Sequence, residues 1–421
     1  MLTIHKIIHN YTFTDRLLPL FFDIETTGFD RNRTILYMIG CVYPEGDCGH
    51  FVQWFNEDGL SEPEILQAFS ELMKKEAWTL VTFNGESFDI PYLKHHSLLN
   101  ELDLPIEEMP SLDLYRILRP FQQLYRLRHG GQKYWERFLG IYREDPYNGG
   151  ELIGVYRSYL QQREDQDLHD LLLHNEEDLL GMPRLMDLLS YHDLVTGDFS
   201  MKDMEITDLA QSSFFQYSSY KDPMEEEEAE DALPQVQLQE PDLMVPCLHF
   251  QGALTRLLPR PLKIGGEHGL FIGEGQDIHL YLPIYSGELK HFYKKYRNYY
   301  YLPQEDRAIH KSVGQFVDKD HRQQAVAANC YMRETGLYLP LPEARKYFGF
   351  QIEAGACYGT LPHFRKSYEA GEEYLQCEKL LFRTDNLFHD YIRDMIMHIF
   401  MTFLESLKTS QPSASPEEDS L

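Results

Sequence analysis

Two carboxylates, Asp23 and Glu25, share one side of a stretch that is otherwise apolar. The run from Leu18 to Phe22 is hydrophobic enough to form a buried strand, in which residues two positions apart point to the same face. Two carboxylates on one buried face repel each other and lose hydration, so something must compensate them. The plainer alternative is an ordinary strand end with one face in water.

Two later segments add side chains that could join this pair. TFNGESFDIPYL leaves a second strand at Asn84 and begins a helix near Ser87, which puts Asp89 in the first turn. An acid there could serve chemistry or simply favour the helix dipole. HDLLLHNEEDLLGM lies on a long amphipathic helix, where His174 and Asp178 are four residues apart and share one face. Such a pair is either an exposed hydrogen-bonded contact or part of a site.

The elements that would position these acids form a mixed sheet. Apolar runs predict four strands, at Leu18–Ile24, Ile35–Tyr43, Phe51–Phe55 and Trp78–Phe83. The short links between the first three strands imply antiparallel pairing, whereas the helix before the fourth permits a parallel return. In that helix, Ser61 and Glu64 have the spacing of a capping box. Further helices are predicted around Pro91–Leu99, Leu112–Leu118, Tyr134–Leu139 and Leu168–Leu189.

The chain divides into two domains joined by an acidic segment. Residues 1–195 hold the α/β pattern, and residues 196–244 contain a run of four glutamates with prolines, which is typical of an exposed linker. Residues 245–408 predict a smaller α+β domain, and residues 409–421 a disordered tail. In the second domain we expect strands at 278–285, 299–302 and 330–339, and helices at 305–317 and 386–407.

Composition limits the class of protein. With 421 residues and 43% hydrophobic content the chain can bury a sizeable core. No window approaches a membrane-spanning length of apolar residues, so we expect a cytoplasmic protein without a membrane partner. The six cysteines lack metal-finger spacing, so a bound metal would be held by oxygen. A net charge of -28 argues against a uniformly basic surface that coats nucleic acid, and the sequence names no protein partner.

Two stretches depart from this acidic balance. Between Tyr115 and Arg143 seven basic residues stand against the single acid Glu136, with Tyr125, Tyr134 and Trp135 among them. This stretch could hold phosphates and stack bases, or it could be a solvated helix face above a few core aromatics. HFYKKYRNYYYLP, from His291, interleaves three cations with tyrosines in the same way. It could guide a strand of nucleic acid or pack in a small core.

The acidic motifs together resemble a known family. DIETTG, then Asn84 to Asp89 in the arrangement N-x-x-x-F-D, then HNEED with its terminal Asp resemble the three motifs of the DEDD-type (DnaQ-like) 3′-to-5′ exonucleases of the ribonuclease H-like superfamily. The intervening SLDLYRIL and KYWERFLGI resemble the bacterial YprB-like branch. The resemblance covers about the first 195 residues and implies a ribonuclease H-like mixed sheet flanked by helices.

The resemblance also implies a metal site. The family's four carboxylates correspond here to Asp23, Glu25, Asp89 and Asp178, which would bind two ions of Mg²⁺ or Mn²⁺ about 3.5 to 4 Å apart. Asp23 would bridge both ions, Glu25 and Asp178 would complete one, and Asp89 would act on the other. Such ions would compensate the paired acids of the first strand.

His174 departs from the family pattern. The late motif of the family has Tyr four residues before the last Asp or His five before it, whereas here His174 stands four before Asp178 and Leu173 stands five before. One residue of shift turns a helical side chain by about 100°. His174 could therefore be a catalytic base or orienting group, or a structural hydrogen-bonding residue. Asn175, beside it, could fix the helix near the substrate.

Further candidate nucleic-acid contacts are Thr26, Asn84 and Phe88 within the motifs, and Arg116, Arg119, Arg126, Arg128 and Lys133 in the basic stretch. Asp113, in SLDLYRIL, is expected to cap or support the helix that carries Arg116 and Arg119, outside the metal shell.

The leading interpretation is a metal-dependent 3′-to-5′ exonuclease that hydrolyses phosphodiester bonds at the 3′ ends of single-stranded RNA or DNA by a two-metal mechanism. One alternative is a nucleic-acid-binding or scaffolding module with a relict site, motivated by the unusual spacing of His174. Another is a metal-dependent endonuclease, which would release internal fragments instead of a nucleotide ladder.

Overall fold

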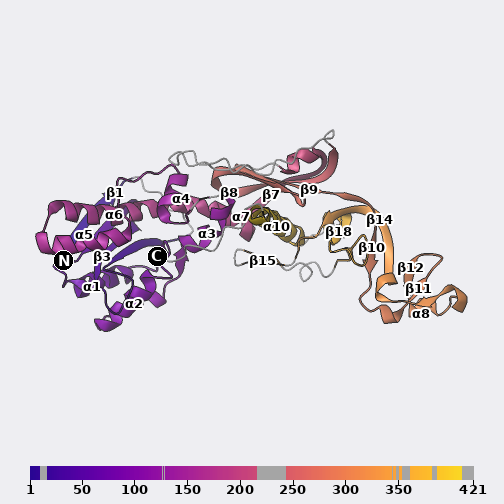
Figure 1. Cartoon of the computed structure of the whole chain (residues 1–421), viewed down its shortest axis with the longest axis horizontal. Helices are drawn as coiled ribbons and strands as arrows, with labels where there is room; N and C mark the ends of the chain where they lie inside the picture. The colour runs from indigo at the N-terminus through magenta and orange to yellow at the C-terminus, as the bar shows by residue number, and fades with distance from the viewer. Residues whose placement is uncertain are drawn as a thin grey trace. The chain divides into compact units, whose positions relative to one another are not determined.

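The computed structural model describes residues 1–9, 17–125, 127, 129–215, 243–343, 345–347, 350–352, 361–381 and 386–409 (Figure 1). The chain forms two compact units, whose boundary in the sequence falls between Leu189 and Ser190. Arg126 and Arg128, most of the predicted linker (216–242) and the predicted tail from residue 410 lie outside the described residues. No helix in the described part of the chain is long and apolar enough to cross a membrane.

A six-stranded mixed sheet forms the centre of the first unit, in the order β1-β4-β3-β2-β5-β6. The strands are β1 Leu2–Ile8, β2 Pro19–Thr26, β3 Leu36–Glu45, β4 Cys48–Phe55, β5 Thr79–Thr82 and β6 Ser111–Asp113. The pairs β1/β4, β4/β3 and β3/β2 are antiparallel, whereas β2/β5 and β5/β6 are parallel. The predicted antiparallel links and the parallel return are therefore confirmed.

Helices cover both faces of this sheet (Figure 1). On one face, α1 (Glu62–Met73) and α2 (Asp89–Leu99) pack against the even-numbered residues of β2, which are Leu20, Phe22 and Ile24. On the other face, α5 (Gly149–Gln162) and α6 (Asp165–Leu185) pack against Tyr37 and Phe55. The remaining helices of this unit are α3 Leu114–Leu124 and α4 Gln132–Phe138, and α7 (Leu189–Thr196) begins at the boundary and lies almost wholly in the second unit.

The start of α1 differs from the predicted capping box. Ser61 precedes the helix, but its hydroxyl donates to Asp58 Oδ1 at 2.8 Å and makes no bond to the helix backbone. A nearby aspartate thus competes successfully for the serine. The capping box occurs instead at α5, a helix that was not predicted, where Asn148 and Glu151 bond reciprocally.

The second unit is rich in antiparallel β-structure. Its first sheet contains β7 (Phe199–Ala210), β8 (Met244–Gly266) and β9 (Gly269–Pro283), and α10 (Leu387–Thr409) packs against β8 and β9. Its second sheet has the order β10 (Tyr285–Phe292), β14 (Tyr331–Pro340), β18 (Tyr374–Gln376) and β17 (His363–Phe364). A small third sheet has the order β12 (Arg307–His310), β11 (Tyr299–Leu302) and β13 (Gln323–Gln324). The remaining elements are α8 Lys311–Gly314, β15 Arg345–Tyr347, β16 Phe350–Ile352 and α9 Cys377–Leu381.

Two segments of this unit differ from prediction. Residues 199–210, placed in the linker, form β7 because they pair with β8 along their whole length, and that partner lies far away in the sequence. Residues 305–317 do not form one helix. Their first part is strand β12, paired with β11, and the helical part is α8 alone. The apolar residues Val313 and Phe316, which stand at helical spacing in this segment, are exposed.

Candidate metal centre

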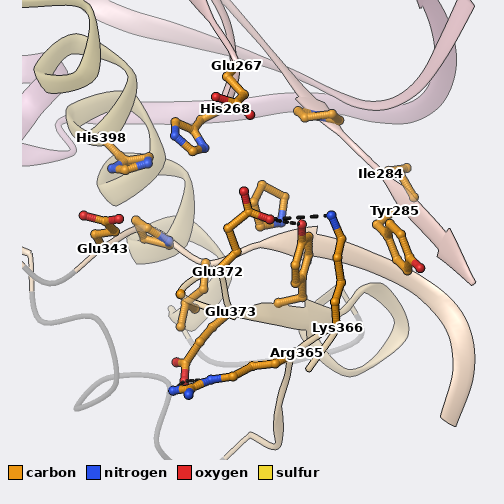
Figure 2. Close-up of a pocket in the computed structure, with 16 residues that line it drawn as sticks. Glu267, His268, Ile284, Tyr285, Glu343, Arg365, Lys366, Glu372, Glu373 and His398 are labelled. Atoms are coloured by element: carbon orange, nitrogen blue, oxygen red, sulfur yellow. Dashed lines mark hydrogen bonds and ion pairs between the residues drawn. The ribbon is translucent and has the colours of Figure 1, made fainter. Parts of the chain in front are cut away.

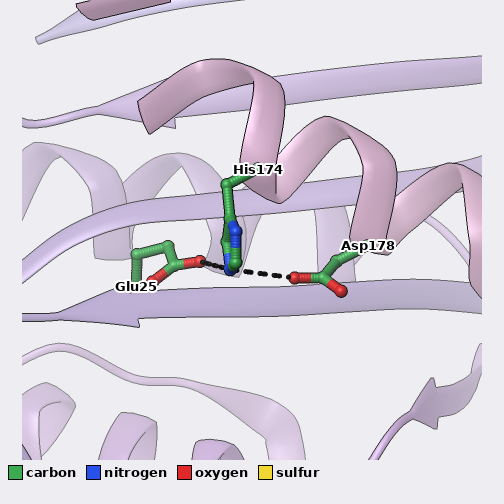
Figure 3. A group of neighbouring side chains, drawn as sticks. All are labelled: Glu25, His174 and Asp178. Carbon is green, nitrogen blue, oxygen red and sulfur yellow. Dashed lines mark ion pairs between the residues drawn. The ribbon is translucent and has the colours of Figure 1, made fainter. Parts of the chain in front are cut away.

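The two acids of β2 face helix α6. Because Leu20, Phe22 and Ile24 fill the opposite side of the strand, the alternate residues Asp23 and Glu25 are left on the α6 side. Glu25 points toward the His174 and Asp178 side chains of that helix (Figure 3).

Helix α6 can approach the sheet this closely because Gly40 of β3 has no side chain. A Cβ atom at that position would lie 2.1 Å from Asn175 Oδ1 and 2.3 Å from Leu179 Cδ1. Asp89 reaches the same site from the first residue of α2, where its Oδ1 accepts a hydrogen bond from the Ile24 backbone N–H at 3.2 Å. The structure therefore brings the four predicted carboxylates together from three separate elements.

Each carboxylate of the centre has one oxygen held by a neighbouring group. Asn175 Nδ2 donates to Asp23 Oδ2 at 2.9 Å, and the Tyr37 hydroxyl donates to Glu25 Oε2 at 3.1 Å. Arg143 Nη2 lies 2.7 Å from Asp178 Oδ1. The second oxygens of Glu25 and Asp178 face the histidine. Such outer contacts fix the orientation of ligands before any ion arrives.

The electrostatics of the centre oppose a cluster of bare anions. Burial, followed by the charges of the neighbouring acids, raises the pKa of Asp23 well above its ordinary value. Burial raises the pKa of Glu25 to about 7, although His174 partly offsets it. Burial also raises the pKa of Asp89 to about 7, against the lowering effect of the Ile24 hydrogen bond. The protein thus holds its carboxylates where negative charge is under-compensated.

His174 points into the centre in spite of its unusual spacing. It is 6% exposed, and its Nε2 lies 3.3 Å from Asp178 Oδ2 and 3.6 Å from Glu25 Oε1. Its other ring nitrogen, Nδ1, lies 2.6 Å from Asp145 Oδ2. Asp145 was not predicted, since it belongs to no motif and lies in the loop between α4 and α5.

Asp145 is itself held by Lys133, whose Nζ lies 2.7 Å from Asp145 Oδ2 and also donates to the Tyr147 carbonyl. Burial would raise the pKa of Asp145, but the hydrogen bonds from Lys133, Tyr147 and His174 outweigh it and lower that pKa. Lys133, predicted to contact nucleic acid, is therefore engaged inside the unit. Its ammonium stabilises the carboxylate that orients the histidine.

Asn175 does more than fix the helix. Its amide nitrogen holds Asp23, and its Oδ1 accepts from Gln53 Nε2 at 3.0 Å. Arg143, which lay in the predicted basic stretch, also turns inward and contacts both Asp178 and the buried Glu136. The basic stretch thus supports the acid centre at two of its positions.

The remaining candidates lie around the centre in different settings. Asn84 is exposed and has a φ of 68°, Phe88 is half-buried, and the Thr26 hydroxyl donates to the Gly28 carbonyl at 2.8 Å. Phe29, which sequence reasoning missed, is 83% exposed and forms an edge-to-face pair with Phe88, their ring centroids 5.8 Å apart. The available signal was an aromatic residue directly after the acidic motif DIETTG.

Helix α3 presents the other two described arginines. Arg119 is exposed, and Arg116 pairs with Glu86 at 3.0 Å while remaining 79% exposed. Asp113 precedes this helix and accepts from the Tyr115 and Arg116 backbone N–H groups, so its predicted capping role is confirmed. The same carboxylate accepts from the backbone of Asn84, which ties α3 to the motif after β5.

The donor set fits a divalent cation. Among the described residues, ligand atoms of Glu25, His174 and Asp178 lie within 4.8 Å of one another, which is the spacing of groups that share an ion. Carboxylate oxygens suit Mg²⁺ and Mn²⁺. The raised pKa values of Glu25 and Asp89 show that positive charge at this point would be favourable.

The second unit contains a cavity with a different lining. Its volume is about 510 Å³, and its wall includes Glu372, Glu373, Arg365, Lys366 and the ring of Tyr374. Figure 2 shows the two glutamates turned toward basic and phenolic partners. Glu373 Oε1 accepts from Arg365 Nε at 2.9 Å, and Glu372 Oε2 accepts from the Tyr374 hydroxyl at 2.7 Å. The acids of this cavity are thus neutralised by the protein itself.

Comparison with known proteins identifies the fold of the first unit. Residues 20–190 match the family model of the RNase_H superfamily, a span that contains all four carboxylates and His174. The chain thus contains a ribonuclease H-superfamily domain, and the predicted ribonuclease H-like α/β sheet with an additional C-terminal domain is confirmed.

Individual relatives are distant. The uncharacterized protein YprB of Bacillus subtilis (strain 168) is 28% identical over 166 residues, which are 38% of this chain and 39% of that protein. The chain thus spans about two fifths of the length of this relative. A family B DNA polymerase from the archaeon Pyrobaculum calidifontis is 17% identical with a TM-score of 0.36, covering 44% of this chain and 26% of that chain. The zinc-bound E. coli ExoI–ssDNA complex is 12% identical with a TM-score of 0.28, and the match covers 45% of this chain and 48% of that chain.

Proposed function

We propose that this protein is a metal-dependent 3′-to-5′ exonuclease of the DEDD type, acting on single-stranded nucleic acid and related to the YprB-like branch. The observation that carries the proposal is the convergence of Asp23, Glu25, Asp89 and Asp178, with pKa values raised for at least three of them. Buried acids with perturbed pKa values cluster at functional sites, because burying them without a function costs stability. A bound cation that neutralises them is the simplest explanation for this cluster.

The four carboxylates would hold Mg²⁺ or Mn²⁺, with Asp23 central between them. Two such ions activate a water molecule for attack on the phosphodiester and stabilise the leaving 3′ oxygen. The surrounding side chains hold the carboxylates in place: Asn175 orients Asp23, Tyr37 orients Glu25 and Arg143 orients Asp178. Loss of one such contact should weaken ion binding more than folding.

The rim of the centre offers contacts for the terminal nucleotides. The exposed Phe29 ring, supported edge-on by Phe88, can stack a base, since every base presents an aromatic face. Arg119 on α3 is exposed and can contact a phosphate. These contacts are sequence-tolerant, which agrees with an enzyme that degrades a strand of any sequence from its end.

The test uses the full chain with 5′-labelled single-stranded RNA and DNA of the same sequence, in Mn²⁺ or Mg²⁺. We expect a ladder of progressively shorter labelled products, abolished by chelation and by Asp23→Asn. Release of internal fragments without a ladder would instead support an endonuclease. Absence of any metal-dependent cleavage on both polymers, with a folded protein, would contradict the proposal in favour of a relict binding module.

The second unit is proposed to guide the strand. Residues 291–333 carry eight lysines and arginines against four acids in a chain of net charge -28. Lys294, Lys295 and Arg297 are exposed, and the Tyr300 ring is flanked by Lys311 at 5.3 Å and by Arg322 at 4.6 Å. Exposed cations beside aromatic rings are typical of single-strand grips.

The guiding role can be measured separately from cleavage. Replacing Lys294, Lys295 and Arg297 together by Gln should weaken single-strand affinity several-fold and lower its salt dependence. The matched control replaces three lysines of the first unit by Gln: the exposed Lys74 and Lys75 and the half-buried Lys94. Equal affinities in both triple and control variants would contradict strand guiding.

A further inference from the structure

We propose that His174 is itself a metal ligand, contributing Nε2 to the same ion as Glu25 and Asp178. This inference rests on the proposed metal-dependent function and deepens it by naming the donor set. The three side chains converge from β2 and α6, with the imidazole between the two carboxylates (Figure 3). The sequence alone indicated a base, an orienting group or a structural residue at this position.

The hydrogen-bonding partner of the ring determines which nitrogen faces the centre. Asp145 Oδ2 lies 2.6 Å from Nδ1, and the Lys133 ammonium keeps this aspartate paired. A carboxylate accepts, so Nδ1 carries the proton and donates it to Asp145. Nε2 is then the atom that presents a lone pair to Glu25 and Asp178. A histidine that donates one ring N–H to a carboxylate while its other nitrogen binds a cation is a recurrent metal-site arrangement.

The surroundings of Nε2 suit an ion. Its nearest carboxylate oxygens, at 3.3 Å and 3.6 Å, belong to acids whose other oxygens are already held by Arg143 and Tyr37. Imidazole and carboxylate ligands bind a divalent transition metal such as Zn²⁺ at about 2.0 to 2.2 Å each, so three ligand atoms within 4.8 Å of one another fit around one ion after small adjustments. The side chain is 7% exposed, so Nε2 faces the acids and not open water.

The spacing on α6 gives the departure from the family pattern a physical meaning. Residues four apart on a helix share one face, as in helical motifs that bind one metal through two side chains. His174 and Asp178 have this spacing, whereas position 173, occupied by a leucine, would be rotated about 100° away. A histidine at position 173 would therefore point to another side of the helix, whereas His174 lies between Glu25 and Asp178.

An imidazole ligand changes which ion the centre prefers. Affinity for nitrogen-containing sites rises along the divalent transition metals from Mn²⁺ onward, whereas Mg²⁺ demands a shell of oxygens, so of these two ions Mn²⁺ tolerates an imidazole ligand better. We therefore expect the centre to select Mn²⁺ over Mg²⁺ more strongly than an all-carboxylate centre would.

The direct test is pulsed electron paramagnetic resonance on the metal-free full chain loaded with Mn²⁺ alone. We expect hyperfine coupling to an imidazole nitrogen in the wild-type protein, loss of that coupling in His174→Gln, and retention in the control His169→Gln, an exposed histidine of the same helix. Absence of nitrogen coupling in the wild type would overturn the inference even if His174→Gln fails to fold. Persistence of the coupling in a folded His174→Gln would overturn it as well.

Calorimetric titration gives a second readout. His174→Gln should weaken Mn²⁺ binding by about 10- to 100-fold, and Mg²⁺ binding much less, while Asp145→Asn should weaken Mn²⁺ binding but keep the nitrogen coupling. Equal losses for both ions would indicate a merely structural histidine and overturn the inference. Nitrogen coupling in a protein without nuclease activity would contradict the proposed function and support the metal ligand. Nuclease activity without nitrogen coupling would support the proposed function and contradict the metal ligand.

Discussion

The acid centre of the first unit and the cavity of the second unit both gather several carboxylates, yet their electrostatics are opposite. In the centre, burial raises the pKa of Glu25 to about 7. In the cavity, the hydrogen bond from His363 outweighs burial and, together with Arg365, lowers the pKa of Glu373 to about 2. The hydrogen bond from Tyr374 likewise lowers the pKa of Glu372.

The difference shows that the number of acids does not make a metal site. The cavity acids have cations and donors provided by the protein, so an added metal ion would have to displace Arg365 or Lys366. In the metal centre, a neighbouring side chain holds one oxygen of Asp23, Glu25 and Asp178. Much of the negative charge of these acids has no cation of the protein beside it in the described part of the chain. Uncompensated negative charge on ligands that are already held in position favours the binding of a cation.

The largest expected difference between the two regions follows from neutralising one acid in each. Asp178→Asn should lower the rate of hydrolysis on the order of 10³-fold, since removing one preorganised electrostatic group costs a comparable factor in other enzymes. Glu373→Gln should leave the rate within about two-fold, because its carboxylate is internally paired. Initial rates on single strands in Mn²⁺ measure both. Similar losses in the two variants would mean that the cavity belongs to the reaction.

Metal binding should separate the two units thermodynamically. Mn²⁺ at about one hundred times its dissociation constant should stabilise the first unit by about 2.7 kcal/mol. All three tryptophans of the chain, Trp54, Trp78 and Trp135, lie in this unit, so tryptophan fluorescence during urea unfolding reports it alone. Asp23→Asn should lose the stabilisation and Glu373→Gln should keep it. Stabilisation that survives Asp23→Asn would place the ion elsewhere.

The dependence of stability on pH should have opposite signs in the two regions. Glu25 titrates near 4.5 when unfolded and at about 7 when folded, so its contribution is present below pH 4.5 and is lost as pH rises toward 7. We expect the unfolding free energy of metal-free wild-type protein, relative to Glu25→Gln, to fall by about 3 kcal/mol over that range. A flat difference would contradict uncompensated charge.

Glu373 should behave in the reverse way. Its folded pKa of about 2 lies below the ordinary 4.5, so its contribution is present above pH 4.5 and is lost as pH falls toward 2. Because Arg365 is partly exposed, Glu373→Gln should cost only about 1 kcal/mol near neutral pH, measured by circular dichroism during urea unfolding. A larger cost at pH 3 than at pH 7 would contradict the predicted sign.

Local patterns predicted much of the first unit. Periodicity placed β2 to β5, the short links predicted the antiparallel pairing of β2 to β4, and the resemblance of the motifs to a known family selected the four carboxylates. These features depend on residues near one another in sequence. Contacts made at long range were not predicted. Asp145 lies in a loop without a motif, and Lys133 was expected to face nucleic acid, yet the two meet beneath His174.

The same limit explains the second unit. β11, β14 and α10 followed from their own sequences, whereas β7 became a strand only because β8 lies beside it. The helical phase within 305–317 was a local preference that the pairing of β12 with β11 overrode. A single helix over this segment would gain no burial from Val313 and Phe316, which are exposed. Pairing with β11 places the residues of β12 in a sheet instead.

The sequence by itself determined which acids lie on one strand face, which elements carry them, and that His174 and Asp178 share a helix face. These properties follow from the fixed geometry of strands and helices. Only the tertiary structure decided that α6 reaches β2 over Gly40, and that Asp145 turns the imidazole toward Glu25. Such decisions depend on close packing between distant segments, which determines where a side chain points and which charges are left without a partner.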